Sequence, residues 1–215
     1  MLISILLIEC KDGLKSNESI DIVPTVVGIN GIEYEINSDF RTSILFELMM
    51  QDNELDDKEK IIQALNLYYP KMPQDINKAV DMLLWFYRGG KDITSNGKGA
   101  GKGKSSQIYS FDYDDDYIYS AFLDQYGIDL QDIEYLHWWK FKAMFKSLKE
   151  DNEIIKIMGY RAMDLSKVRD KEQRAYYKKM KDLYKIPAKI NKNEQEKLSD
   201  IQRALMGDGN VSSVL

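Results

Sequence analysis

The sequence predicts a mainly helical α+β protein in which an N-terminal β-hairpin packs on a multi-helix bundle. Several segments repeat apolar residues at the spacing of a helix face that is buried against other elements. The dipeptide Asn30-Gly31 separates two short β-rich runs, which indicates a hairpin. With 215 residues, of which 44% are hydrophobic, the chain is long enough to bury a core in one or two domains.

The composition narrows the class of protein. Cys10 is the only cysteine, which excludes an intramolecular disulfide and a cysteine-based zinc site and favours a cytosolic compartment. The apolar start of the chain is too short for a membrane span and lacks the basic flank of a signal peptide, so we expect no membrane association.

Residues 1–139 hold 24 acidic and 12 basic residues, whereas residues 140–215 hold 11 acidic and 18 basic residues. This asymmetry indicates either an interaction surface in the basic part or two halves that complement each other in the fold.

Residues 1–37 are expected to form an N-terminal extension and the hairpin. The runs 26–29 and 32–36 flank the Asn-Gly pair, and both residues of that pair readily adopt the positive φ angles of a tight turn. A lone hairpin is only marginally stable in water, so this one should pack on helices.

Residues 38–90 are expected to form the first helical half. The predicted helices are 39–50, capped by Asn37 or Ser38, then from the acidic pair 56–57 to Pro70, and from Pro73 to Gly89-Gly90. The side chains that these helices should bury are Phe40, Ile44, Leu48, Ile61, Leu65, Tyr68, Ile76, Ala79, Val80, Leu83, Leu84 and Tyr87.

Residues 91–108 are rich in glycine and lysine and poor in bulky apolar residues, so we expect a flexible basic loop. Residues 109–186 should form a second helical half in the same domain as the first. Its predicted helices are 113–126 followed by Gly127, 132–148, 152–158 ended by Gly159, and a last helix from Asp170 that Pro187 closes. The tail, 187–215, should be weakly helical or disordered.

The segment 132–148 is expected to be the central helix, around which the others pack. It contains the only histidine and two of the three tryptophans. One face, at helical spacing, carries Ile133, His137, Phe141, Met144 and Leu148. Trp138 and Trp139 flank this face on opposite sides, which assigns one tryptophan to the core and leaves the other for a partner.

The glycine-lysine loop matches a phosphate-binding P-loop only at its end. Gly103-Lys104-Ser105 fits the last residues of that motif, but Lys98 stands where its first glycine is required. A P-loop also follows a buried strand, whereas this segment follows a predicted helix. We therefore expect no nucleotide and no other cofactor.

Asp112, Asp114, Asp115 and Asp116 form a dense carboxylate cluster. An EF-hand loop that began at Asp112 would need a glycine where Tyr117 stands and a glutamate where Leu123 stands. Acidic residues at the start of a helix explain the cluster better, because they face the positive end of the helix dipole. We expect no metal ion there.

His137 offers little for catalysis. A lone histidine on an apolar face is more often a hydrogen-bonded core residue than a metal ligand or a general base. No pair of carboxylates stands out for acid–base chemistry. The sequence therefore predicts no enzymatic activity and no catalytic residue.

The last predicted helix carries two different faces. One face is apolar, with Tyr176, Met180, Leu183 and Tyr184, and the opposite face is basic, with Arg174, Lys178, Lys181 and Lys185. Tyr176 and Tyr177 beside basic side chains are a combination that nucleic-acid-binding proteins use for stacking and phosphate contacts. Because the whole chain is acidic, with a pI near 5.1, a solvated basic face is the favoured interpretation.

Five stretches, in the same order along the chain, resemble the bacteriophage Gp-fifteen family of tailed-phage proteins. They are IEYEINSDFR at 32–41, LWFYRGG at 84–90, YDDDYIYSAF at 113–122, YGIDL at 126–130 and GYRAMDLS at 159–166. The central segment 132–148 is also similar, and the likeness covers residues 24–186.

The resemblance implies a tail-morphogenesis protein of siphophages and prophages of Gram-positive bacteria, encoded next to the tape measure protein. This position is similar to that of tail assembly chaperones, which hold the long helical tape measure protein soluble while tail tube protein polymerises around it. It implies action in the host cytoplasm without enzymatic residues. The alternatives are a structural tail component retained in the virion and, third, a nucleic-acid-binding phage protein.

The expected partners are the tape measure protein, another tail protein or a second copy of the chain. An amphipathic helical client needs apolar grooves or exposed aromatic side chains. We therefore predict partner binding near Trp138, Trp139, Arg161, Tyr176 and Tyr177.

Overall fold

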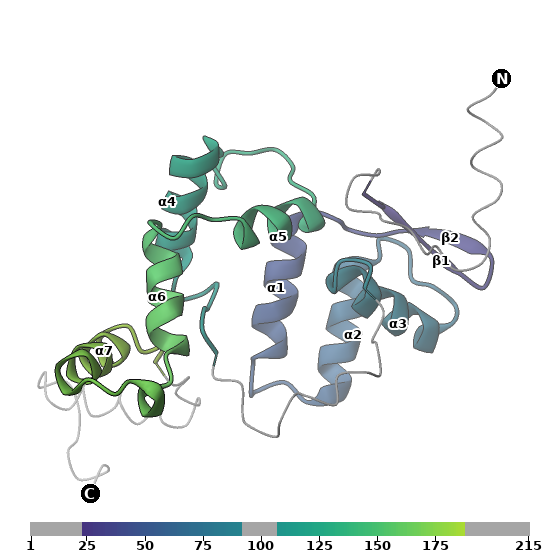
Figure 1. Cartoon of the computed structure of the whole chain (residues 1–215). Coiled ribbons are helices and arrows are strands. Elements are labelled where there is room, and N and C mark those ends of the chain that lie inside the picture. The colour runs from purple at the N-terminus through teal and green to yellow at the C-terminus, as the bar shows by residue number, and fades with distance from the viewer. Residues whose placement is uncertain (1–22, 92–106, 188–215) are drawn as a thin grey trace, which may run out of the picture.

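The computed structural model describes residues 23–91 and 107–187 (Figure 1). Within these ranges the chain forms seven α-helices, a short 3-10 helix and a two-stranded antiparallel sheet. The predicted fold class, mainly helical with an N-terminal hairpin, is confirmed. Most of the N-terminal extension, of the basic loop 91–108 and of the tail 187–215 lies outside the described residues.

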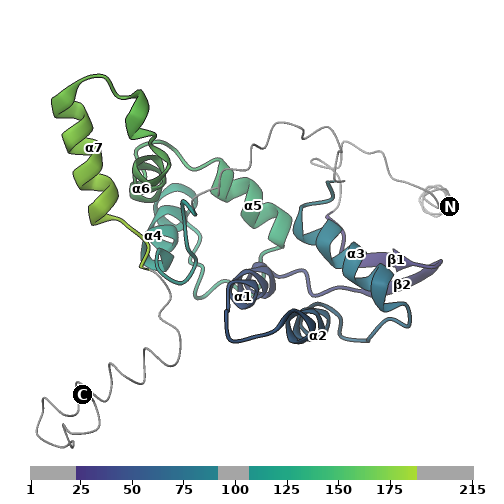
Figure 2. The same cartoon turned by 90° about the horizontal axis from the view of Figure 1, so that it is seen from below.

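The elements are β1 (Val26–Ile29), β2 (Ile32–Glu35), α1 (Phe40–Met50), α2 (Asp57–Tyr68), α3 (Ile76–Tyr87), α4 (Asp115–Tyr126), α5 (Trp138–Lys146), α6 (Glu153–Ala162), η1 (Leu165–Lys167) and α7 (Lys171–Leu183). The hairpin and α1–α3 lie on one side of the molecule, while α4, α6 and α7 lie on the other (Figure 1). Helix α5 lies between the two groups, as the view from below also shows (Figure 2).

The hairpin turn has the predicted geometry. Asn30 and Gly31 adopt φ angles of 52° and 78°, as a two-residue hairpin turn requires. The strands pair in antiparallel register, with Val27 opposite Tyr34, and both of these side chains are buried. Strand β1 contacts α3, so the hairpin gains the helical support that a two-stranded sheet needs.

The first three helices begin close to the predicted positions, but the cap of α1 differs. Asp39 caps α1 by accepting a hydrogen bond from the Arg41 N–H, whereas Asn37 bonds to the Leu67 carbonyl and Ser38 to the Tyr135 hydroxyl. The cap of α2 is reciprocal, since Asp56 and Glu59 each accept from the other's backbone N–H.

Two side chains predicted to be buried are exposed. Ile61 and Ile76 are 45% and 43% exposed and lie in the N-terminal parts of α2 and α3. The core instead closes around residues further along these helices, namely Ala64, Leu65, Tyr68, Ala79, Leu83 and Phe86.

The predicted central helix, 132–148, is wrong at its start, because α5 spans only Trp138–Lys146. The Phe40 N–H donates to the Leu136 carbonyl, and the Trp138 N–H donates to the Ser38 carbonyl. Asp39 also accepts a hydrogen bond from the Leu136 N–H. The chain ahead of α5 therefore pairs with the chain ahead of α1, and this pairing uses backbone groups that a longer helix would need.

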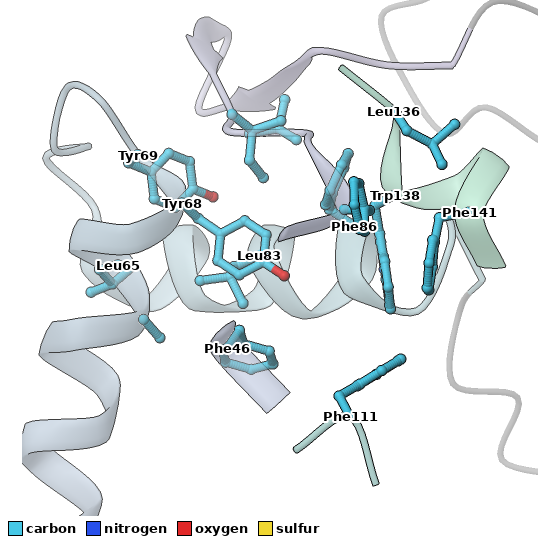
Figure 3. Close-up of a cluster of buried hydrophobic side chains, with 14 of the residues drawn as sticks. Phe46, Leu65, Tyr68, Tyr69, Leu83, Phe86, Phe111, Leu136, Trp138 and Phe141 are labelled. Atoms are coloured by element: carbon cyan, nitrogen blue, oxygen red, sulfur yellow. The ribbon is translucent and has the colours of Figure 1, made fainter. Parts of the chain in front are cut away.

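Helix α5 nevertheless contributes to the buried cluster, in which Figure 3 shows its Trp138 and Phe141 side chains close to Phe86 of α3. The Phe141 ring stacks on Phe40 and Phe122, with ring centroids 5.0 and 4.9 Å apart, and it also stacks on Trp138. These contacts join α1 and α4 through α5, and one cluster of buried side chains contains residues of both helical halves. The predicted core position of this segment is confirmed, with a shorter helix.

Helix α6 is longer than predicted. Gly159 was expected to end it, but the helix continues to Ala162. Glycine raises the free energy of a helix interior by only about 1 kcal/mol relative to alanine. The contacts of Arg161 in the last turn, described below, favour the longer helix.

Candidate functional site

The structure places the predicted partner-binding residues in three different surroundings. Trp138 is 3% exposed, and its indole N–H donates to the Tyr87 carbonyl at 2.9 Å. The half-buried Trp139 donates its indole N–H to the Phe86 carbonyl at 2.8 Å. Both tryptophans therefore attach α5 to the C-terminal end of α3 through their indole N–H groups, and partner binding by either ring stays a prediction.

Gly90 completes this contact. A Cβ atom at Gly90 would lie 2.6 Å from the Trp139 ring, and the residue has a φ angle of 75°. A left-handed backbone that lies against an aromatic ring favours glycine on both grounds. Gly89-Gly90 thus ends α3, as predicted, and also makes room for Trp139.

Arg161 is a structural residue. Its guanidinium is buried and forms two hydrogen bonds with the fully buried Asp114 carboxylate, at 2.6 and 2.9 Å. It also donates to the Tyr184 carbonyl at 2.6 Å and to the Ile108 carbonyl at 3.1 Å. Arg161 therefore joins the start of α4, the end of α6 and the end of α7, and it is too buried to serve as a freely accessible contact for a partner.

Asp114 was predicted only as one of several acids at a helix start. It makes no cap hydrogen bond with the first turn of α4, but it accepts from the Ser110 N–H as well as from Arg161. One sequence signal could have separated it from its neighbours: Asp114 precedes the buried Ile118, Ala121 and Phe122 at the spacing of one helix face.

Tyr176 and Tyr177 lie at the surface, on α7. They belong to a tyrosine cluster formed by Tyr160, Tyr176, Tyr177 and Tyr184. The Tyr160 ring stacks on Tyr184, and its hydroxyl lies 3.4 Å from the Tyr176 hydroxyl. This hydroxyl contact, with partial desolvation, raises the pKa of Tyr160 to about 12.

Helix α7 leaves apolar side chains uncovered. Tyr176 and Leu183, which the sequence places on the apolar face of this helix, are 50% and 65% exposed. Met180 and Tyr184 of the same face are half-buried, as are Tyr177 and Lys181, and the Lys181 ammonium donates to the Met163 carbonyl. Beside the end of α7 lies a groove of about 890 Å³, which also borders the loop after α1.

A second concavity, here called the aromatic pocket, lies between α5 and α6. It has a volume of about 400 Å³, and its walls include Tyr109, Phe145, Ile155 and Met158. Trp138 also lines it, so this predicted partner residue presents part of its buried ring to the pocket.

A match to a known family covers the region just described. The family model for bacteriophage Gp15 protein matches residues 20–186. The chain belongs to this family. No curated protein and no solved structure matches the chain.

The only histidine of this Gp15-family chain holds a helix start. His137 is buried at the N-cap of α5, where Nδ1 accepts from the Trp139 N–H at 3.0 Å and Nε2 lies 2.9 Å from the Pro24 carbonyl. Nε2 must therefore carry the proton of a neutral ring. Burial lowers the pKa of His137, and the predicted role as a hydrogen-bonded core residue is confirmed, although on a cap and not on a helix face.

The described part of the family region contains no group of three His, Cys, Asp or Glu side chains arranged to hold a metal ion. Over the same residues, no helix is long and apolar enough to cross a membrane.

Proposed function

We propose that this phage protein is a non-enzymatic tail assembly protein that binds the tape measure protein as a chaperone during tail morphogenesis in the host cytoplasm. Membership of the bacteriophage Gp15 protein family supports a phage role. The resemblance of five sequence stretches to tail-morphogenesis proteins supports a role in the tail. Within the described residues, the observation that carries the proposal is the uncovered apolar face of α7, which contains Tyr176 and Leu183.

This face has the chemistry that a helical client requires. An amphipathic helix binds through apolar side chains spaced at one face, and the partner must offer a complementary apolar surface. Tyrosine is enriched among the residues that dominate binding energy, because it brings a large rigid ring and a polar tip. Tyr176 of the tyrosine cluster shares α7 with Leu183, and the main packing partners of α7 among the described elements are α6 and η1.

Co-expression with the tape measure protein of the same phage tests the proposal. The wild-type chain should co-purify with the tape measure protein and increase its soluble fraction. A double variant, Tyr176→Ala with Leu183→Ala, should lose most of this effect because both changes remove uncovered apolar area from α7.

The matched control is Leu45→Ala with Ile62→Ala. These side chains on α1 and α2 are similarly exposed, at 54% and 49%, but lie in the other half of the molecule. The control should co-purify as the wild type does. Equal loss in both double variants, or no loss in either, would remove α7 as the binding site.

The place of the protein after assembly is a separate expectation. A chaperone leaves when the tail is complete, so mass spectrometry of purified phage particles should not detect the chain. Its recovery in the particles at the level of a structural subunit would favour a tail component retained in the virion.

A further inference from the structure

The aromatic pocket combines an apolar interior with a basic rim. Its lining includes Tyr109 and Phe145 on one side and Ile155 and Met158 of α6 on the other. Lys142 and Lys146 of α5 are its only charged lining residues within the described parts of the chain. The volume of about 400 Å³ is large enough for one or two bulky side chains and lies at the low end of ligand pockets.

Lys142 is held at the mouth of this pocket. Its ammonium donates to the Tyr87 carbonyl at 2.8 Å and lies 5.4 and 5.5 Å from the centroids of the Trp138 and Tyr87 rings. An ammonium carries three N–H donors, and the described residues supply this one hydrogen-bond acceptor. The remaining donors are available to an anionic group.

The charges around Lys142 favour an anion. Lys146 and Lys91 both act on it as like charges, and Glu47 is the opposing carboxylate. The Glu47 carboxylate is already engaged by the hydroxyls of Tyr87 and Tyr109. Burial, with the two neighbouring lysines, lowers the pKa of Lys142 to about 8, so a carboxylate at the rim would relieve an unfavourable positive field.

We propose that the aromatic pocket binds an acidic protein segment, which inserts one bulky apolar side chain and directs its carboxylates to Lys142 and Lys146. Charge complementarity carries the choice of occupant: an apolar anchor alone would fill the pocket, but only an acidic segment would also pair with the rim. The inference deepens the proposed function, since it names the chemistry of a partner segment and a contact surface separate from the α7 face.

The test uses the full chain and three synthetic amphipathic peptides. The first peptide carries one central phenylalanine between glutamates, the second replaces that phenylalanine with alanine, and the third replaces the glutamates with lysines. Binding is followed by NMR through the indole N–H signal of Trp138, which lines the pocket. Only the first peptide should shift this signal at low concentration, and loss of its phenylalanine should weaken binding about thirtyfold, as for an interface hot spot.

Two variants test the rim and one serves as control. Lys142→Met keeps the length of the side chain, and Lys146→Glu changes an exposed position, so we expect both variants to fold. Thermal unfolding checks this. Lys142→Met should weaken binding of the acidic peptide about fivefold, the scale of an exposed ion pair, and Lys146→Glu should weaken it further. Lys140→Glu on the same helix, outside the pocket lining, should bind about as the wild type does.

Raising the pH from 7 to 9 gives a readout independent of folding. Lys142 loses its proton over this range, because its pKa is about 8. The acidic peptide should therefore bind the wild type more weakly at pH 9, while Lys142→Met should show a smaller change. Glu47, Lys91, Lys146 and Tyr87 are the ionisable groups around Lys142, and Tyr109 lines the same pocket.

Several results would overturn the proposal. These are equal binding of the acidic and basic peptides, wild-type affinity in both rim variants, or a Trp138 signal that shifts with protein concentration alone and so identifies a second copy as the occupant. None of them involves the tape measure protein. Failure of the pocket would therefore leave the co-purification result intact, and failure of co-purification would leave the peptide result intact.

Discussion

At the scale of single residues, the buried ion pair between Asp114 and Arg161 fixes the second half of the molecule. The Arg161 guanidinium donates two hydrogen bonds to the Asp114 carboxylate, at 2.6 and 2.9 Å, and a further one to the Tyr184 carbonyl at the end of α7. Removing one partner of such a pair leaves an uncompensated charge in the interior, which is much worse than removing both. The position of α7, and of its apolar face, therefore depends on this pair.

Asp114→Ala should lower the free energy of unfolding by about 3–5 kcal/mol, as expected when one partner of a buried pair is lost. Asp116→Ala, in the same acidic run but exposed, should change it by less than about 1 kcal/mol, since it loses only its interaction with the helix dipole. Urea unfolding followed by circular dichroism measures both values. Similar small losses in the two variants would contradict the structural role of Asp114.

His137 makes stability depend on pH in a defined direction. Burial lowers the pKa of His137 in the folded chain. In the unfolded chain the histidine has its ordinary pKa of about 6.5, so its ring binds a second proton more readily there. Stability therefore falls as the pH drops below about 6.5, until the folded-state pKa is reached.

His137→Asn should flatten this dependence, because asparagine can accept the Trp139 N–H as an N-cap but does not titrate. The measurement is the free energy of unfolding at pH 5 and pH 7 for both proteins. An equally steep decrease in the variant would assign the acid sensitivity to other groups.

At the scale of elements, the boundaries that sequence patterns missed were those set by tertiary contacts. Apolar spacing predicted a helix over 132–148, yet the backbone at 136–138 pairs with the backbone at 38–40. Apolar periodicity indicates which residues face the core. It does not indicate whether the backbone N–H and C=O groups of those residues pair with a distant segment. Gly159 has a different cause: glycine often follows a helix end, but the contacts of Arg161 in the last turn favour a helix that continues to Ala162.

Two glycines should respond oppositely to alanine. Gly159→Ala lies in a helix with open space around the new Cβ, so it should stabilise the chain by about 0.5–1 kcal/mol. Gly90→Ala meets the Trp139 ring and has a positive φ angle, so it should destabilise the chain by at least about 1 kcal/mol. Thermal unfolding distinguishes the two signs, and stabilisation by both changes would show that Trp139 does not pack against Gly90.

At the scale of the whole molecule, α5 joins two helical groups, and the surfaces that we propose for partners lie at α7 and between α5 and α6. The hairpin, the start of α2 and the end of α4 at Gly127 were predictable, because turn, cap and left-handed positions each require particular residue types. The candidate site was less predictable. Tryptophan and arginine are residue types that are enriched at interfaces. Trp138 and Arg161 are nevertheless buried, by residues that are distant in the sequence.

The basic C-terminal part of the chain fits this arrangement. The aromatic pocket has lysines at its rim, and α7 carries a basic face beside its tyrosines. Of the two explanations of the charge asymmetry, both features favour an interaction surface for an acidic, apolar partner. They favour it over charge complementarity between the two halves of the chain.

The most direct test of the chaperone proposal is the amount of tape measure protein that stays soluble when it is expressed with and without this chain. We expect the soluble fraction to rise with the wild-type chain, a complex of the two proteins to elute together in size-exclusion chromatography, and both effects to fall in the Tyr176→Ala, Leu183→Ala variant. An unchanged soluble fraction and no complex, with both proteins expressed and the chain folded, would contradict the account.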